Sequence, residues 1–164
     1  LNYLYINLVD EKKLLKYAVD YLSKYDSSKN NLIEILKRKI FRLNLSGIEK
    51  SRLINLINVI ILKLENNNLI NDKRYSFSRI SSLSRAGKSK NFIFNYLIKK
   101  GVDKYDIENN LKDFQESNLE WELESAKLFA KKKKLYESSD SYEKKLAKMA
   151  RAGFSYEICK KILN

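Results

Sequence analysis

Two stretches, Leu97-Ile98-Lys99-Lys100-Gly101-Val102-Asp103 and Met149-Ala150-Arg151-Ala152-Gly153-Phe154-Ser155, follow one pattern at an offset of 52 residues. Each has the end of an apolar helix, a basic turn with a glycine, and then an apolar residue. The likeness continues beyond the glycine at the same offset, where apolar residues correspond in pairs: Ile107 with Cys159, and Leu111 with Leu163. Self-similarity at a fixed spacing is typical of repeat proteins. We therefore expect Gly101 and Gly153 to be the C-caps of equivalent helices.

A partial third copy precedes these two. Leu36-Lys37-Arg38-Lys39-Ile40 lies 61 residues before the stretch that begins at Leu97, so the first copy contains about nine additional residues, near 41–49. The sequence thus predicts three tandem three-helix repeats, over residues 1–66, 67–118 and 119–164. Because neighbouring repeats bury their apolar faces against each other, we expect an all-α fold in the form of an elongated, curved array.

The periodicity of apolar residues supports this fold class along the chain. The 164 residues include no proline and four glycines, whereas an all-β fold of this length needs many more turn residues. Helices are expected over about residues 11–24, 28–43, 48–66, 72–87, 89–100, 103–114, 119–136, 140–152 and 155–163.

Three local features complete the expected fold. Asp10 is the expected N-cap of the first helix. The helix over 48–66 has apolar residues around its whole circumference, so we expect neighbouring elements to cover it on several sides. Cys159 occupies an apolar position of its repeat, and we interpret it as a small buried hydrophobe.

The charge of the chain indicates an acidic partner. Lys and Arg total 33 against 20 Asp and Glu, a net charge of +13, and the excess is spread evenly over the three predicted repeats. A basic folded protein binds polyanions, such as nucleic acid, an acidic protein groove or an anionic membrane. The alternative is a solvated surface in a lysine-rich proteome.

Other compositional features exclude several classes of protein. The chain has no histidine and one cysteine, which excludes an intrachain disulfide and ordinary zinc sites and fits the reducing cytoplasm. The sequence contains no phosphate-binding glycine loop, serine elbow or paired carboxylates, so we expect neither an enzyme nor a cofactor. No apolar run approaches 18 residues, and the apolar start, Leu1–Val9, lacks the basic flank and length of a signal peptide.

Residues 73–102 contain no acid, and basic residues alternate with aromatic ones there. Such surfaces can bind a nucleic-acid backbone and stack bases. We interpret Tyr75, Phe92 and Tyr96 as core residues, and Phe77 and Phe94 as candidates for exposure or packing between repeats. A run of four lysines over 131–134 is either a solvated helix segment or a contact for phosphate or acidic protein. The candidate residues for binding a partner or DNA are Lys73, Arg74, Arg79, Arg85, Lys88, Lys90, Lys99, Lys100, Lys131 and Lys134.

The order of the motifs resembles that of the RecX family over about residues 11–163. The family signature has Leu-Leu-Asp-Asp-x-Arg-Phe, then an arginine-rich stretch with Gly-Lys-Gly, then Leu-x-x-Lys-Gly-Ile. The corresponding stretches here are Leu69-Ile70-Asn71-Asp72-Lys73-Arg74-Tyr75, Arg85-Ala86-Gly87-Lys88-Ser89 and Leu97-Ile98-Lys99-Lys100-Gly101-Val102. Ala18-Val19-Asp20-Tyr21-Leu22 matches the start of the first repeat, and Gly153-Phe154 matches the usual close. The chain departs from the signature at Asn71, Tyr75 and Ser89, and has Ser81 and Ser84 where the family often has arginine.

The resemblance implies a function. RecX proteins bind the filament of the RecA recombinase, lie in its helical groove, and lower its ATP hydrolysis and strand exchange. The resemblance therefore implies a non-enzymatic monomeric regulator in recombination, DNA repair and the SOS response, with the RecA filament and its single-stranded DNA as partners. Two alternatives stay open from the residues themselves. One is a basic protein that binds single-stranded nucleic acid without RecA, and the other, which is weaker, is a peripheral protein of anionic membranes.

Overall fold

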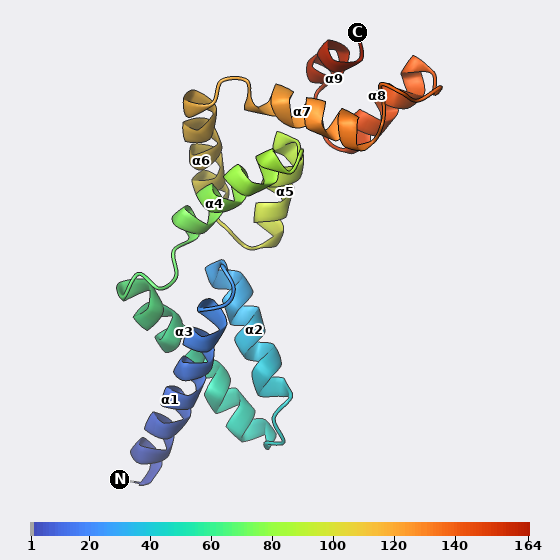
Figure 1. Cartoon of the computed structure of the whole chain (residues 1–164). Helices are drawn as coiled ribbons and strands as arrows, with labels where there is room; N and C mark the ends of the chain where they lie inside the picture. Colours follow the sequence, from blue (N-terminus) through green and yellow to red (C-terminus); the bar gives the residue numbers. More distant parts are fainter. Residues whose placement is uncertain (1) are drawn as a thin grey trace. The chain divides into compact units, whose positions relative to one another are not determined.

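The computed structural model describes the backbone of residues 2–164 and the side chains of residues 11–164. Over that part of the chain the backbone is helical and contains no strand (Figure 1). All nine expected helices are confirmed: α1 Asn2–Leu22, α2 Lys29–Phe41, α3 Gly47–Asn66, α4 Asp72–Arg85, α5 Lys90–Lys99, α6 Lys104–Ser117, α7 Trp121–Lys132, α8 Tyr142–Arg151 and α9 Tyr156–Leu163. None of these helices is long and apolar enough to cross a membrane.

The chain divides into two compact units, of which the first ends at Tyr75 and the second covers Ser76–Asn164. In the first unit α1, α2 and α3 pack against one another. In the second unit α5 packs on α6, and α9 packs on both α7 and α8. The helices fall into three groups of three, which is compatible with three repeats. The repeat boundaries at 66/67 and 118/119 stay a prediction.

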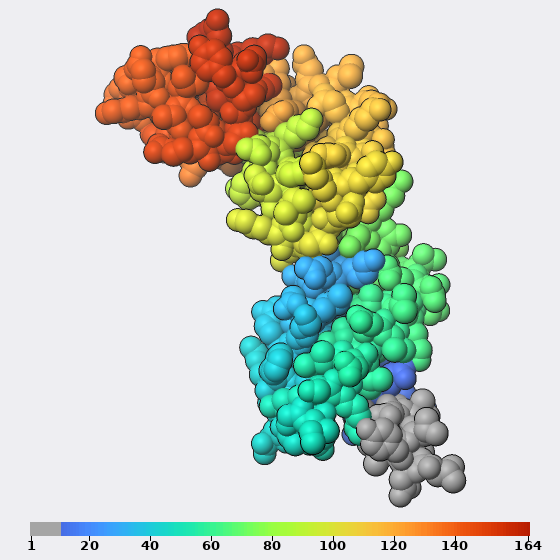
Figure 2. All heavy atoms as spheres, turned by 180° about the vertical axis from the view of Figure 1, so that it is seen from behind, coloured from blue at the N-terminus to red at the C-terminus, as the bar shows by residue number. Residues whose placement is uncertain are grey.

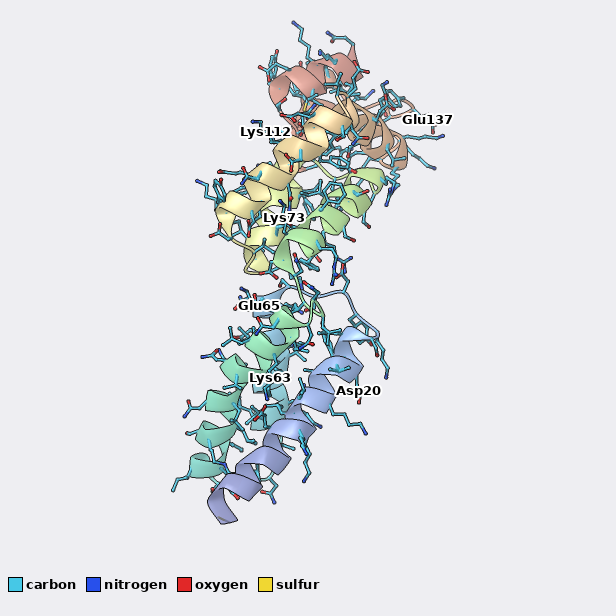
Figure 3. All side chains as sticks on the ribbon, turned by 90° about the vertical axis from the view of Figure 1, so that its left-hand side faces the viewer. Asp20, Lys63, Glu65, Lys73, Lys112 and Glu137 are labelled. Carbon is cyan, nitrogen blue, oxygen red and sulfur yellow. The ribbon has the colours of Figure 1, made fainter. Side chains whose placement is uncertain are left out.

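The core of the first unit is aliphatic. Leu32, Leu36 and Ile40 line one side of α2 and are fully buried against α1 and α3. Polar contacts also join the three helices. Lys63 pairs with Glu11, Glu65 pairs with Lys29 at 2.8 Å, and Figure 3 labels Lys63 and Glu65 near the end of α3. The backbone N–H of Lys29 also donates to Asp72 Oδ1 at 2.7 Å, so the start of α4 is held against the start of α2.

The prediction that α3 is covered on several sides is wrong. The side of α3 that faces α1 and α2 is buried, and it includes Leu53, Ile57, Ile60, Ile61 and Leu64. Val59 and Leu62, on the other side, are 41% and 59% exposed. Two neighbouring helices cover only part of a helix circumference, and the apolar composition of the remaining face does not bring a third element to it.

Capping residues explain most of the helix starts. Serines at N-cap positions accept a hydrogen bond from the backbone N–H three residues later, which satisfies a donor that the helix itself leaves unpaired. The side chains of Ser28, Ser46, Ser89, Ser141 and Ser155 all do this.

Asn71 is an N-cap that was not predicted from the sequence, and Asp10 is a predicted N-cap that is wrong. Asn71 Oδ1 accepts from the N–H of Arg74 at 2.9 Å, so asparagine performs the capping role that the aspartate of the RecX signature would perform. Asp10 is not an N-cap, because α1 already begins at Asn2 and Asp10 lies inside it. The side chains of the apolar start, Leu1–Val9, lie outside the described residues.

The end of α7 also differs from the prediction. The sequence predicts a helix through residue 136, but α7 ends at Lys132 and Lys134 has a positive φ of 52°. The N–H of Leu135 donates to the carbonyl of Ala130 and that of Lys134 to the carbonyl of Lys131, which is the hydrogen-bond pattern of a Schellman motif. Leu135 is thereby buried. The run 131–134 is therefore the last turn of α7 and its cap, not the middle of a helix.

Glycine caps are confirmed in the second unit. Gly87, Gly101 and Gly153 follow α4, α5 and α8 and have φ values of +81°, +72° and +88°. L-residues with a side chain rarely adopt this conformation, and glycine does so readily. The equivalence of Gly101 and Gly153 in the sequence therefore corresponds to the same backbone conformation at the ends of α5 and α8.

Candidate nucleic-acid interface

The turn between α4 and α5, residues 86–89, is held by α7. The hydroxyl of Ser125 donates to the carbonyl of Lys88 at 2.8 Å, and Lys132 Nζ donates to the carbonyl of Ala86 at 3.0 Å. At the start of α5, the N–H of Lys90 donates to Glu122 Oε1 at 3.1 Å. Three side chains of α7 thus bind backbone atoms of the turn and the residue after it.

Close packing fixes the same turn. A Cβ atom on Gly87 would lie 3.2 Å from the N of Phe129 and 3.3 Å from the carbonyl oxygen of Ser125, so a larger residue there would require α7 to shift by a few tenths of an ångström. Ser89 is fully buried, and its hydroxyl donates to the carbonyl of Ala152 at 2.7 Å. The signature stretch 85–89 is therefore mainly a structural joint between α4–α5 and α7–α8, and not a flexible binding loop.

The structure separates the ten candidate residues. Lys73 and Arg74 belong to the first unit and the other eight to the second. Lys73 is labelled on α4 in Figure 3. Exposed candidates are Lys73, Arg74, Arg85, Lys90, Lys99, Lys131 and Lys134, and half-buried ones are Arg79, Lys88 and Lys100.

Several candidates already have partners within the chain. Arg74 Nη2 donates to the carbonyl of Asn68 at 3.2 Å. The ammonium of Lys88 lies 4.6 Å from the centre of the Phe92 ring, and that of Lys100 lies 5.9 Å from the centre of the Tyr96 ring. These cations lie against aromatic rings and remain next to solvent.

In the second unit, some lysines form ion pairs and others do not. On α6, Lys104 pairs with Glu108 at 3.6 Å and Lys112 with Glu116 at 3.9 Å. By contrast, no ion pair within the described side chains involves five exposed candidates: Arg85, Lys90, Lys99, Lys131 and Lys134. These five come from α4, α5 and the end of α7, and their positive charge is available to a phosphate backbone.

A groove of about 940 Å³ lies between α5, α6 and the turn that joins α8 to α9. In Figure 2 the yellow surface of α6 and the orange-to-red surface of α8 and α9 border the same face of the second unit. Apolar lining comes from Phe94, Leu111 and Phe154. The charged lining consists of three acids and two bases: Glu108, Glu116, Glu122, Lys90 and Lys112. In a chain of net charge +13, this is a place where acids outnumber bases.

The aromatic residues of the basic stretch are only partly as predicted. Tyr75 is buried and Phe77 is 49% exposed, as expected. The core interpretation of Phe92 is wrong, since its side chain is 39% exposed, and Tyr96 is half-buried. Ile93 and Leu97 fill the core side of α5, which directs their neighbours Phe92 and Tyr96 away from it.

The thiol of Cys159 and the acidic side chains are the groups that could react or bind a metal ion. Cys159 is fully buried beside Met149 and Phe154, which confirms its interpretation as a small hydrophobe, and burial raises the pKa of its thiol. Among the described side chains, no group of three or more Cys, Asp and Glu residues is arranged to hold a metal ion.

Comparison with known proteins agrees with this arrangement. No family model matches the chain. It is 29% identical over 155 residues to the regulatory protein RecX of Myxococcus xanthus, a match that covers 90% of this chain and 82% of that protein. The crystal structure of RecX from Lactobacillus salivarius has a TM-score of 0.70 and 27% identity, and the match covers 95% of this chain and 96% of that one. A second crystal structure, titled as regulatory protein RecX, has a TM-score of 0.73 at 21% identity over 96% of this chain and 73% of that one, and shows the fold alone. In the order of its motifs, in sequence and in fold, the chain is thus similar to regulatory proteins of the RecX family.

Proposed function

We propose that the chain regulates the RecA recombinase by binding the RecA–DNA filament and inhibiting its ATP hydrolysis and strand exchange. The observation that carries this proposal is the similarity to RecX proteins, since one relative and one solved structure each match at least nine tenths of the chain. It acts as a monomer in the cytoplasm, and its three repeats, over 1–66, 67–118 and 119–164, provide several points of contact with one filament.

The unpaired cations suit the DNA of such a filament. Arg85, Lys99 and Lys131 are exposed and have no ion-pair partner among the described side chains. A phosphate contact releases condensed counterions from DNA, so each one adds affinity at low salt and makes binding dependent on salt. Lysines on α6 that already pair with glutamates contribute less.

The groove between α5, α6 and the α8–α9 turn suits protein. Of its three glutamates, Glu108 and Glu116 pair with lysines of α6, and Glu122 has no ion pair among the described side chains. Its apolar residues, including Phe94 and Leu111, can bury side chains of a partner. We propose that it receives a segment of RecA that has an apolar stripe flanked by Lys or Arg, because such a segment matches both the apolar lining and the excess of glutamate. A regulator of a nucleoprotein filament needs both kinds of surface.

Co-sedimentation tests this proposal. RecA is assembled on circular single-stranded DNA with a non-hydrolysable ATP analogue, and the chain is added at increasing concentration. We expect the chain to pellet with the filament at salt concentrations that release it from the same DNA without RecA, since contacts with protein are less sensitive to salt. Equal retention by bare DNA and by filaments at every salt concentration contradicts the proposal.

The second candidate function is binding of single-stranded nucleic acid without RecA. It is favoured by the exposed aromatic and basic residues of α5, which include Phe92 and Lys99. Such a protein loses affinity steeply with salt and needs no RecA. The bare-DNA samples of the same sedimentation experiment distinguish the two functions.

A further inference from the structure

A smaller cleft, of about 230 Å³, lies on the side of α5 that meets the end of α8. Two aromatic rings, Phe92 and Tyr96, line it from α5, together with the amide side chains of Asn91 and Asn95. Lys99 and Arg151 add two exposed cations. No carboxylate lines the cleft. It therefore differs from the larger groove, whose lining includes three glutamates.

The rings are available to a ligand because the core of the second unit does not need them. Ile93 and Leu97 are fully buried on the core side of α5. Phe92 and Tyr96 are four residues apart and so lie on one face of the helix. Phe92 is 39% exposed, so part of its side chain is open to solvent.

A lysine ammonium group lies near each of the two rings. The ammonium of Lys88 lies 4.6 Å from the centre of the Phe92 ring, and that of Lys100 lies 5.9 Å from the centre of the Tyr96 ring. With Lys99 and Arg151, four positive side chains lie in or beside the cleft. A flat apolar ligand with negative charge at its edge can stack on the rings and pair with the cations at the same time.

We propose that this cleft binds an unpaired base of single-stranded nucleic acid, with the base stacked on Phe92 and Tyr96 and the flanking phosphates bound by Lys99 and Arg151. Aromatic rings stack any base, because every base has a π-face, and the lysine and arginine side chains follow the backbone. The base takes the face of the Phe92 ring that the Lys88 ammonium leaves open. This inference deepens the proposed function, on which it rests, by assigning contacts with unpaired bases to one face of α5.

The geometry also predicts selectivity for single strands. Bases in a duplex are already stacked and paired, so they reach a cleft of this kind only after unstacking, which costs free energy. The amides of Asn91 and Asn95, which are joined by a hydrogen bond of 3.1 Å, can form hydrogen bonds with a base edge. We expect tolerance for base identity, because stacking contributes more to binding than these amides do.

Fluorescence anisotropy with a labelled oligothymidine of about 15 nucleotides, without RecA, tests the cleft directly. Phe92→Ala is expected to weaken binding about tenfold without changing its dependence on salt, since a stacking contact releases no counterion. Phe92→Trp is expected to retain the affinity. The matched control is Tyr105→Ala, which removes a 72% exposed aromatic side chain that does not line the cleft. Circular dichroism and thermal melting establish that each variant is folded.

An oligonucleotide of the same length with abasic sites provides the decisive comparison. It keeps the phosphates and removes the bases, so the effect of Phe92→Ala is expected to disappear on it, as in a double-mutant cycle between ring and base. Equal binding of thymidine oligomers by the wild type and Phe92→Ala overturns the proposal, and so does an equal effect on both oligomers. Equal loss of affinity in Tyr105→Ala overturns it as well.

These measurements are independent of RecA. If the cleft does not bind bases, the proposal of filament regulation is still tested separately, by the sedimentation and ATP hydrolysis experiments. Conversely, a chain that binds thymidine oligomers through Phe92 but has no effect on RecA supports the cleft and contradicts the proposed function.

Discussion

The hydroxyl of Ser89 donates a hydrogen bond of 2.7 Å to the carbonyl oxygen of Ala152, and it accepts one of 3.1 Å from the N–H of Phe92. One buried side chain therefore caps the start of α5 and joins it to the end of α8, 63 residues later in the chain. In the RecX signature a glycine is usual at this position, and a glycine can make neither bond. The departure from the signature thus has a structural role in this protein.

Ser89→Gly is expected to lower the free energy of unfolding by about 1–2 kcal/mol. Replacing the N-cap serine by glycine costs a few tenths of a kcal/mol, and the rest comes from removal of the bond to the carbonyl of Ala152 at the end of α8. Urea unfolding followed by circular dichroism measures this change. Ser141→Gly is the matched control, because Ser141 caps α8 and is exposed. If both variants are destabilised by the same few tenths of a kcal/mol, the bond to Ala152 contributes nothing.

Gly153→Ala is expected to destabilise the fold by more than about 1 kcal/mol. Its φ of +88° is unfavourable for alanine, and the new Cβ would lie 2.7 Å from Ser89 Oγ. Part of the destabilisation should disappear in the Ser89→Gly background, because the contact with Oγ is then absent. Gly47→Ala is the control, since a Cβ there meets no atom within 4 Å. The melting temperatures of the single and double variants measure these effects. If the decreases caused by Gly153→Ala and Ser89→Gly simply add in the double variant, the new Cβ does not meet Ser89 Oγ.

Lys99→Gln with Lys131→Gln is expected to weaken binding of single-stranded DNA and to reduce the slope of log affinity against log salt by about 1 for each phosphate that the variant no longer binds. The control is Lys104→Gln with Lys112→Gln, which removes the same charge from lysines that pair with Glu108 and Glu116. Binding is measured by anisotropy over a salt series. An equal change of slope in both pairs would mean that net charge, and not position, determines binding.

Ala150→Trp is expected to weaken inhibition of RecA several-fold and to leave binding of bare oligonucleotides unchanged. Ala150 lines the larger groove and is exposed on α8, so an indole there occupies space that we assign to a RecA segment without disturbing the core. The control is Ala147→Trp, which adds the same side chain at an exposed position of α8 that does not line the groove. Unchanged inhibition in Ala150→Trp removes the groove from the proposed function.

The fold class and the nine helices were predictable, because periodic apolar positions and capping residues are local features. Ser155 and Asp103 cap α9 and α6 at the positions where the repeat comparison aligns them. Long-range contacts were not predictable in this way. Nothing local distinguishes Ser89 from the other capping serines, although its hydroxyl donates to the end of a helix 63 residues later in the chain.

The composition identified the stretch that contains most of the candidate site, but it did not identify which side chains of that stretch form one surface. The acid-free stretch 73–102 directed attention to α5, yet Phe92 was assigned to the core because it is adjacent to the inward stripe. Its exposure depends on Ile93 and Leu97, which fill the space beneath α5. The two cations of the cleft, Lys99 and Arg151, are 52 residues apart, and only the packing of α8 near α5 brings them to one cleft.

The central claim, regulation of RecA, is tested most directly by RecA ATP hydrolysis that depends on single-stranded DNA, with this chain titrated from substoichiometric amounts upward. We predict inhibition at well below one copy of the chain per RecA, because one bound regulator affects several neighbouring subunits of a filament. No inhibition at molar excess over RecA from a matching source would contradict the account and leave a basic helical protein that binds single-stranded nucleic acid.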